Sequence, residues 1–549
     1  MATTLPSPLT APPTRAPMTT VQRFTLMATG LGLFMIYLDA LIVNVALPVI
    51  QADFQVGESG LQWVVTTYSI GMAVAIMSAA TLADLHGRRK LYIAGIAVFT
   101  ASSIGCGMAP TLDVLNVART VQGIAAATVN VTSLALVSAA FPEPKQKARA
   151  IGIWTAIAST AMAIGPTLGG LLVQTSGWRS IFLVNVPVGI VAVFVTLRFV
   201  AESRDPRERR FDVAGQVLFA LAVGSFAYAV IDGPKVGWSS MRIIALFIVA
   251  FAALAAFIRY ERASQDPMMD LTLFRDRTYS LAIVTIFSVL FSIYGMLLVT
   301  TQYLQNVRGY SPTDTGLLLL PFSATMTIVS LTVGHVVGKV GTRLPILVGL
   351  VAMIIGYAMM IAAMPTSIVG VVIGMMSGSL GAASCLTPIT SLAMTSVPPE
   401  RAGMASGIMS AQRAIGSTVG FAVLGSILAG WLGATLDRDL AAALPDHVER
   451  SDVVSAIVKN ANPRAYVAEI GPGRPIQHDN AALRDGILRI TDQDFVQGIR
   501  LALASAIVLL ASVLVAGFVG FPRRTQAIAQ AEQEAAQLEK REEAPGAEP

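Results

Sequence analysis

Residues 80–90 read ATLADLHGRRK, a short charged segment where one long uncharged run, 59–83, gives way to another, 91–112. Each run is long enough to cross a bilayer as a helix, which takes about 20 apolar residues. Gly87 permits a tight turn, and the basic residues after it are typical of a loop at a membrane surface. The stretch therefore predicts two membrane-spanning helices joined by a short polar turn.

Runs of the same kind fill most of the chain of 549 residues, which is 54% hydrophobic and only 13% charged. Soluble domains carry about 25% charged residues, so a soluble enzyme, a coiled coil and a disordered chain are excluded as descriptions of the whole. The run 344–399 is too long for one span, and Met364-Pro365-Thr366-Ser367 near its middle predicts a turn. The sequence therefore predicts 14 transmembrane helices, in the runs 24–52, 59–83, 91–112, 114–142, 150–178, 180–197, 213–231, 243–258, 278–307, 315–338, 344–399 (two helices), 402–436 and 501–522.

Lysine and arginine are distributed unevenly between the two sets of short loops. The loops after even-numbered spans hold eighteen of them, and the short loops after odd-numbered spans hold four. Because basic loops stay in the cytoplasm, we expect a multi-pass protein of the plasma (inner) membrane with both termini cytoplasmic. Residues 437–498 then form a long external loop, for which a small partner-binding cap and a disordered segment are both open interpretations.

The segment 80–90 has a weaker copy, GHVVGKVGTR, at residues 334–343. Aligning Gly87 with Gly341 also aligns Arg89 with Arg343. Parallel internal repeats are typical of alternating-access transporters, which bind substrate between two halves near the midplane. The predicted organisation is a disordered cytoplasmic tail at 1–23, a six-helix bundle at 24–200, a linker at 201–277 with two extra spans (213–231 and 243–258), a second six-helix bundle at 278–522 and a cytoplasmic tail at 523–549.

Other classes of protein find little support. The two cysteines, Cys106 and Cys385, lie inside apolar runs, and the four histidines are scattered, so neither a metal site nor a catalytic nucleophile is predicted. There is no Walker-type phosphate loop, so we expect neither ATP as the energy source nor any cofactor. A polytopic enzyme or receptor is the least favoured class, and the net charge of +5 arises mostly from short loops rather than from a nucleic-acid-binding surface.

Asp39 interrupts the first span and Arg119 interrupts the fourth. Ionisable residues within a membrane are rare, and they usually face a partner or a cavity and serve function. Burial favours the neutral form of a carboxylic acid and a nearby cation favours its charged form, so a carboxylate between these effects can carry protons. We predict that Asp39 is the main proton-coupling carboxylate, with a purely structural hydrogen bond as the alternative. Arg413, near the cytoplasmic start of its span, is expected to extend toward the lipid headgroups.

Several stretches resemble motifs of one family, the major facilitator superfamily. The loop 80–90 is similar to its signature loop, although Ala80 and Leu85 replace a usual Gly and a common Arg. Residues 115–127, with RTVQG at 119–123, resemble its span-4 motif, and GPTLGG at 165–170 resembles the span-5 motif of its drug-exporting antiporters. Residues 38–48, 267–275 and 305–312 look like its 14-helix drug:proton antiporter branch, within which the chain most resembles actinobacterial spectinomycin/tetracycline-type efflux pumps.

The resemblance implies an all-helical fold of two six-helix bundles plus two central helices, and no enzyme activity. It implies a proton-driven antiporter that exports amphipathic drugs, with spectinomycin and tetracycline as candidates, by alternating access. Arg119 would then tune the proton site, where a static clamp between helices is the alternative. The resemblance also assigns gating residues: Asp84, Gly87, Arg88 and Arg89 would latch the two halves when the outside is open, beyond setting topology, and Gly165, Pro166, Gly169 and Gly170 would kink span 5 and seal the external side, beyond ordinary packing.

A cavity for varied drugs should be large and mainly apolar, with few polar groups. By depth alone, the candidate substrate-binding residues are Asn44, Trp63, Tyr68, Asn130, Trp154, Tyr294 and Gln302. The expected partners are small-molecule drugs, protons and the lipid bilayer, with no nucleic acid and a monomeric chain. The alternative function within transport is a dedicated exporter of an endogenous metabolite or lipid.

Overall fold

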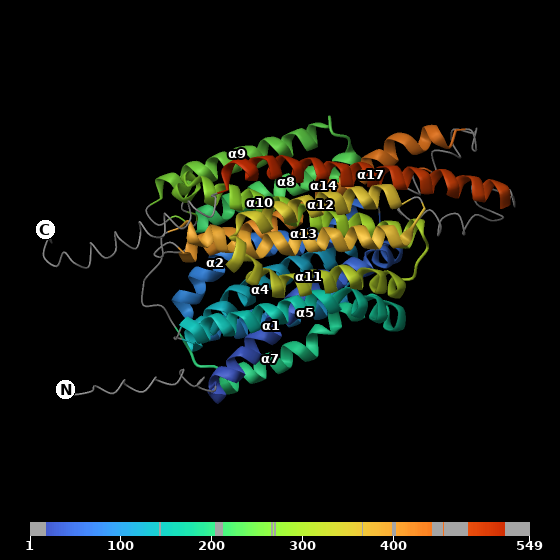
Figure 1. Ribbon diagram of the computed structural model, residues 1–549. Coiled ribbons are helices and arrows are strands. Elements are labelled where there is room, and N and C mark those ends of the chain that lie inside the picture. Colours follow the sequence, from blue (N-terminus) through green and yellow to red (C-terminus); the bar gives the residue numbers. More distant parts are fainter. Residues whose placement is uncertain are drawn as a thin grey trace, which may run out of the picture.

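The computed structural model describes residues 18–56, 58–141, 144–203, 212–264, 271–364, 366–397, 402–441 and 481–521, together with Pro267, Met269 and Val454. Within these residues every regular element is a helix, so the predicted all-helical architecture is confirmed. The long helices run side by side along one common direction (Figure 1). Most of the two predicted tails and of the predicted loop 437–498 lies outside the described residues.

The helices fall into two long sets with a pair between them. The first set is α1 (Thr20–Phe54), α2 (Glu58–His86), α3 (Arg88–Gly107), α4 (Leu112–Ala140), α5 (Pro144–Ser176), α6 (Ser180–Leu183) and α7 (Asn185–Phe199). The pair is α8 (Val213–Val236) and α9 (Met241–Ala263). A short 3-10 helix η1 (Leu271–Arg275) leads into the second set, which is α10 (Arg277–Gln302) with a π-helical turn η2 (Tyr303–Val307), α11 (Pro312–Val340), α12 (Arg343–Ala363), α13 (Ile368–Thr395), α14 (Ala402–Asp439) and α17 (Ala481–Gly520).

Twelve of the described helical segments are long and apolar enough to cross a membrane, and they include both α8 and α9. They coincide with twelve of the fourteen predicted spans. The other two predicted spans, 59–83 and 150–178, fall on α2 and α5, which are long helices that contain side chains outside the described set. The structure therefore confirms a polytopic membrane protein with an extra central pair.

Local sequence explains where several helices begin and end. Thr19 and Gln22 exchange hydrogen bonds with each other's backbone N–H groups and so cap the start of α1. Ser311 caps α11, and Pro312 follows it at the first helical position, where its missing N–H costs nothing. The predicted turn at 364–367 is confirmed, because α12 ends at Ala363 and α13 begins at Ile368.

The packing partners in the first set recur in the second. In the first set α1 packs on α4, α5 and α7, while α3 packs on α4 and α7. In the second set α10 packs on α13, α14 and α17, while α12 packs on α13 and α17. Each helix therefore has a counterpart in the other set, and α8 and α9 have none.

The two turns that were aligned in the sequence are also equivalent in structure. Gly87 and Gly341 both adopt positive φ, at 101° and 81°, a conformation that glycine takes without a steric penalty. Two residues later, Arg89 donates from Nη2 to the carbonyl of Leu197 near the end of α7, at 2.5 Å. Arg343 donates in the same way to the carbonyl of Phe518 near the end of α17. The turn after α2 marks one end of the bundle, here called the Gly87 end, and the turn after α5 marks the opposite Gly177 end.

The two sets meet mainly through α5 against α11 and α2 against α14. The closest of these approaches lie toward the Gly177 end. A Cβ atom on Gly170 would lie 2.4 Å from the carbonyl oxygen of Pro312, and one on Gly425 would lie 2.3 Å from the amide nitrogen of Gln62. The α8 helix packs on both α2 and α14, so it lies across one of the two seams between the sets.

Candidate functional site

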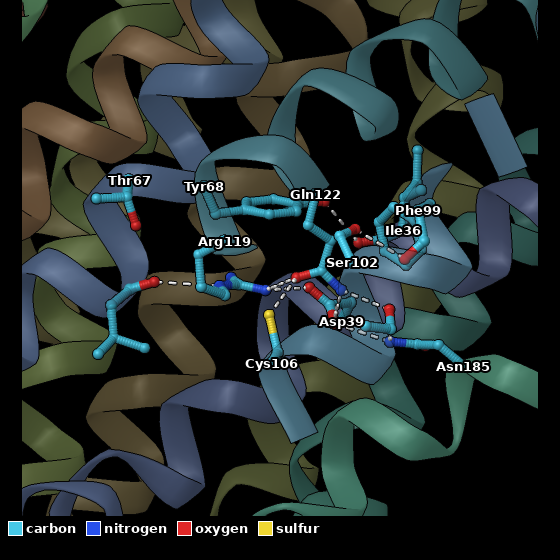
Figure 2. Close-up of polar contacts among 12 residues, drawn as sticks. Ile36, Asp39, Thr67, Tyr68, Phe99, Ser102, Cys106, Arg119, Gln122 and Asn185 are labelled. Carbon is cyan, nitrogen blue, oxygen red and sulfur yellow. Dashed lines mark hydrogen bonds and ion pairs between the residues drawn. The ribbon is translucent and has the colours of Figure 1, made fainter. Parts of the chain in front are cut away.

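Asp39 on α1 and Arg119 on α4 form a buried ion pair (Figure 2). The distance from Arg119 Nη1 to Asp39 Oδ2 is 2.5 Å, and the side chains are 1% and 0% exposed for Arg119 and Asp39, respectively. An unpaired charge at such depth costs several kcal/mol, so each group compensates the other. The two intramembrane charges that the sequence singled out separately thus form one site.

The second oxygen of Asp39 is held by two side-chain amides. Asp39 Oδ1 accepts from Gln122 Nε2 at 3.0 Å and from Asn185 Nδ2 at 2.9 Å. Both amides also donate to Ser103 Oγ, at 2.7 Å and 3.4 Å. The carboxylate therefore accepts three hydrogen bonds, all from side chains of α4 and α7.

Arg119 has partners besides Asp39. Its Nε donates to the carbonyl of Val64 at 3.1 Å, and its Nη1 also donates to Gln122 Oε1 at 2.6 Å. The guanidinium carbon lies 4.3 Å from the ring centre of Tyr68 and 5.6 Å from that of Phe182, and Figure 2 shows Tyr68 beside the guanidinium. The cation is therefore still held by dipoles and ring faces if Asp39 takes up a proton.

Two local features of the sequence build this cluster. Arg119 and Gln122 are three residues apart in α4, which places them on one helix face. Asn185 is the first residue of α7, directly after the break that separates it from the four-residue α6. Asn185 and Ser103 were not predicted as site residues. The sequence offers one indication of Asn185, because its amide side chain lies inside the otherwise apolar run 180–197.

A separate small pocket, with a volume of about 30 Å³, lies between α1, α10 and α11. Its walls are mainly apolar, with hydroxyl groups from Tyr294 and from one helix, α11. The lining residues are Leu41, Ile293, Tyr294, Leu297, Phe322, Ser323, Met326, Thr327 and Ser330. Both sets of helices contribute to it, so it lies where a substrate between two halves would bind. Of the predicted substrate-binding residues, Tyr294 lines this pocket.

The other predicted substrate residues lie elsewhere. Tyr68 belongs to the Arg119 cluster, and Trp63 packs on Tyr228 of α8, with ring centres 5.3 Å apart. Asn44 is buried with no hydrogen bond to its Oδ1, and Gln302 Oε1 accepts from Asn306 one turn later. Trp154 packs beside the buried cluster of Leu26, Val137, Phe141 and Ala150, and Asn130 is half-buried on α4.

The turn after α2 is bound to the segment that follows α7. Glu202 accepts from the backbone N–H of Arg89 at 2.9 Å and of Lys90 at 3.3 Å, while Arg88 N–H donates to the carbonyl of Ser203 at 3.0 Å. A Cβ on Gly87 would lie 2.9 Å from the Glu202 carboxyl group. The predicted gating residues Gly87, Arg88 and Arg89 are thus brought together, whereas the side chain of Asp84 lies outside the described residues.

The predicted span-5 motif forms the contact between α5 and α11. Gly170 lies against Pro312, and a Cβ on Gly316 would lie 2.3 Å from the carbonyl oxygen of Pro166. Thr313 Oγ1 donates to the carbonyl of Gly170 at 2.9 Å. Gly165 and Gly169 instead face α1, near Leu41 and Ile42. The motif therefore has one face on the first set and another on the second set.

Arg413 on α14 contacts a neighbouring helix. Its Nη2 donates to Thr390 Oγ1 on α13 at 2.7 Å, and both side chains are half-buried. The side chain therefore ends between two helices of the second set.

Known proteins of one family are similar to this chain along most of its length. Residues 29–421 match the family model of the Major Facilitator Superfamily. The chain is 59% identical over 506 residues to the "Multidrug resistance protein Stp" of Mycobacterium tuberculosis (strain CDC 1551 / Oshkosh), covering 92% of this chain and 93% of that protein. It is 44% identical over 507 residues to the "Drug efflux pump JefA" of the same strain, covering 92% and 99%.

A solved structure of a bacterial homolog of the human lysosomal transporter Spinster, inward-facing and unoccupied, has a similar fold. Its TM-score is 0.61 and its identity is 16%, over 92% of this chain and 99% of that chain. The fold and the site define a polytopic membrane transporter. The chain belongs to the Major Facilitator Superfamily.

Proposed function

We propose that the protein is a proton-driven multidrug efflux antiporter that exports amphipathic drugs from the cytoplasm. Membership of the superfamily and the printed names of the two mycobacterial relatives support drug efflux. Spectinomycin and tetracycline are the drugs to test first, because the sequence most resembles pumps of that type. The buried Asp39–Arg119 pair is the single observation that carries proton coupling.

A proton on Asp39 would remove the negative charge that Arg119 pairs with. The O–H of the neutral acid can donate one hydrogen bond, whereas the carboxylate accepts from Arg119, Gln122 and Asn185. Protonation therefore requires at least one of these three contacts to rearrange. Since they connect α1 to α4 and α7, the protonation state can bias how the helices of the first set pack.

Alternating access requires two halves that move against each other. We assign these halves to the first and second sets of helices. The same pattern of helix packing occurs within each set, whereas the two sets meet mainly through α5 with α11 and α2 with α14. The basic loops assign the Gly87 end to the cytoplasm. The close contacts of Gly170 and Gly425 then seal the external side, and substrate would bind in the pocket that Tyr294 lines.

The test uses inverted membrane vesicles with an imposed proton gradient. Tetracycline, spectinomycin or a cationic dye is added, and proton release from the lumen and substrate uptake are followed together. We expect substrate-triggered proton movement in the wild type and in Asp53→Asn, and none in Asp39→Asn. Asp53 is a matched control, since it lies on the same helix but is about half-exposed and pairs with Arg179 at 3.0 Å.

Coupled transport that persists in Asp39→Asn would remove Asp39 from the mechanism. No response to any of the three compounds, with the protein present in the membrane, would contradict multidrug export. It would favour the alternative, a dedicated exporter of an endogenous metabolite or lipid.

A further inference from the structure

Arg413 lies on the inner face of α14. Gly416 and Gly420 follow it by three and seven residues, so all three share one side of the helix. Cβ atoms on these glycines would lie 2.8 Å and 2.2 Å from the carbonyl oxygens of Phe287 and Phe291 on α10. Arg413 therefore projects toward neighbouring helices of the second set.

Arg413 has a neutral partner and no carboxylate. Its one hydrogen bond among the described residues goes to Thr390 Oγ1, and its buried Nε has no acceptor there. No Asp or Glu occurs in residues 278–307, 315–338, 344–397, 402–436 or 501–522, which are the predicted spans of the second set. The acids of α17 (Asp485, Asp492 and Asp494) precede its predicted span. In the first set the one membrane-embedded carboxylate in the middle of a span, Asp39, is already paired with Arg119.

The membrane-embedded charges of the two sets therefore do not cancel. Asp39 and Arg119 neutralise each other, and Arg413 adds one positive charge. A charged side chain inside the membrane costs several kcal/mol unless a counter-charge or water compensates it. A second copy of the Asp39–Arg119 arrangement would need an acid in α10 or α13, and neither helix contains one.

Arg413 lies toward the end of the bundle from which a substrate exported from the cytoplasm would enter. Thr390 lies five residues before the end of α13 at Thr395, which is about 8 Å along a helix. Both residues thus belong to the Gly87 end of the bundle. Further along α14, Phe421 contacts the ring of Tyr294 on the pocket wall, with ring centres 6.1 Å apart. The same helix therefore carries the cation and touches the pocket.

We propose that Arg413 is a binding site for the anionic group of an acidic amphipathic substrate, such as a carboxylate, a phenolate or an enolate. The guanidinium presents a planar set of donors that matches such oxygens, and Thr390 fixes its orientation. Further along α14, the aromatic rings of Phe421 and of Tyr294 on α10 offer apolar surface to the body of the substrate. The inference rests on the proposed efflux function, because it names the substrate class of that same transporter.

The test compares two xanthene dyes of similar shape and opposite charge, fluorescein as the anion and rhodamine 6G as the cation. Equilibrium binding of each dye to purified protein is measured by fluorescence anisotropy, with no proton gradient. Wild type should bind fluorescein more tightly than rhodamine 6G. In Arg413→Gln the Kd for fluorescein should rise about tenfold or more, because a charge pair in a desolvated site is lost, and the Kd for rhodamine 6G should not rise.

Two further variants separate charge recognition from a structural role. Arg413→Lys keeps the cation and should retain part of the preference for fluorescein. Thr390→Val removes the neutral partner and leaves the charge, so the preference for fluorescein should persist. Equal loss of binding of both dyes in Arg413→Gln, or a wild type that binds rhodamine 6G as tightly as fluorescein, would overturn the proposal. Because binding is measured without a gradient, a failure of proton coupling in vesicles would be a separate result.

Discussion

At the scale of single residues, the charged form of Asp39 depends on donors that come from other helices. Arg119 supplies one of them, and the amides of Gln122 and Asn185 supply the others. Each hydrogen bond to a buried charge contributes about 1.5–3 kcal/mol. The amides therefore help to hold the Asp39 carboxylate in place beside Arg119.

Asn185→Leu tests this contribution. Leucine has a similar size and removes the donor to Asp39 Oδ1, so the carboxylate loses one of the contacts that hold it beside Arg119. We expect drug-dependent proton flux to fall about tenfold, since a tenfold change in rate corresponds to about 1.4 kcal/mol, close to the contribution of one hydrogen bond to a buried charge. The flux is measured in vesicles under an imposed proton gradient.

The matched control is Asn116→Leu, the same change on α4, where the Oδ1 of Asn116 has no hydrogen-bond partner. Its proton flux should remain that of the wild type. Equal losses of flux in Asn185→Leu and Asn116→Leu would mean that Asn185 only supports packing.

At the scale of elements, the contact between α5 and α11 depends on the absence of side chains at two glycines. A Cβ on Gly170 or on Gly316 would meet backbone atoms of the opposing helix at 2.4 Å or 2.3 Å. Backbone atoms cannot move aside as the end of a side chain can. The two helices must therefore separate if either glycine is replaced.

Gly170→Ala and Gly316→Ala should each weaken the sealed state of the Gly177 end by about 1–3 kcal/mol, the usual cost of overpacking. We expect substrate-independent proton leak to rise and coupled transport to fall, measured in the same vesicles. Gly224→Ala on α8 is the control, because nothing lies within 4 Å of the Cβ position there. A wild-type leak rate in both test variants would show that this contact does not seal the protein.

The elements themselves could largely be predicted from the sequence, because the bilayer imposes a minimum length on each apolar run and a positional bias on basic residues. The turn at 364–367 and the extra pair α8–α9 follow from that rule. The partners of Asp39 could not be predicted in the same way. Periodicity gives the face of a helix but not the neighbour that it meets, and Asn185 reaches the site only because α6 and α7 are offset at a break.

The candidate substrate residues show the same limit. Trp63 and Tyr294 are aromatic residues inside predicted spans, yet Trp63 packs on α8 and Tyr294 lines the pocket. The difference arises because α8 lies across the seam between α2 and α14, a placement that no local pattern encodes. The first and second sets are predictable as repeats, whereas the position of the inserted pair depends on tertiary packing.

At the scale of the whole molecule, α8 contacts both sets at different depths. Gln216 lies near the Gly87 end. Its Nε2 donates to the carbonyl of Val74, and its Oε1 accepts a hydrogen bond from Ser78 Oγ, both on α2. Further along α8, the carbonyl of Val230 accepts from Ser426 on α14 at 2.6 Å. The α8 helix therefore contacts the first set near its start and the second set near its end. Any rocking of the two sets must change at least one of these contacts.

A covalent bond across the opposite seam tests whether such rocking is required for transport. Gln174 on α5 and Thr313 on α11 are hydrogen-bonded through their side chains at the Gly177 end. Oxidation of Gln174→Cys/Thr313→Cys should hold the sets together there and lower drug transport at least about tenfold, since the external side cannot open. A reducing agent should restore the rate. The two native cysteines are buried and should not interfere.

The control places the same cross-link within one set. A Cβ on Gly95 of α3 would lie 3.3 Å from the Cβ of Thr128 on α4, near the separation of the two Cβ atoms in a disulfide, and both helices belong to the first set. Oxidation of Gly95→Cys/Thr128→Cys should leave transport at the rate of its reduced form, because that bond joins parts of one rigid unit. If the Gln174–Thr313 cross-link forms and transport continues, substrate leaves by a route that does not separate α5 from α11. The seam bridged by α8 would then be the moving one, and the contacts of Gln216 and Ser426 would become the next to substitute.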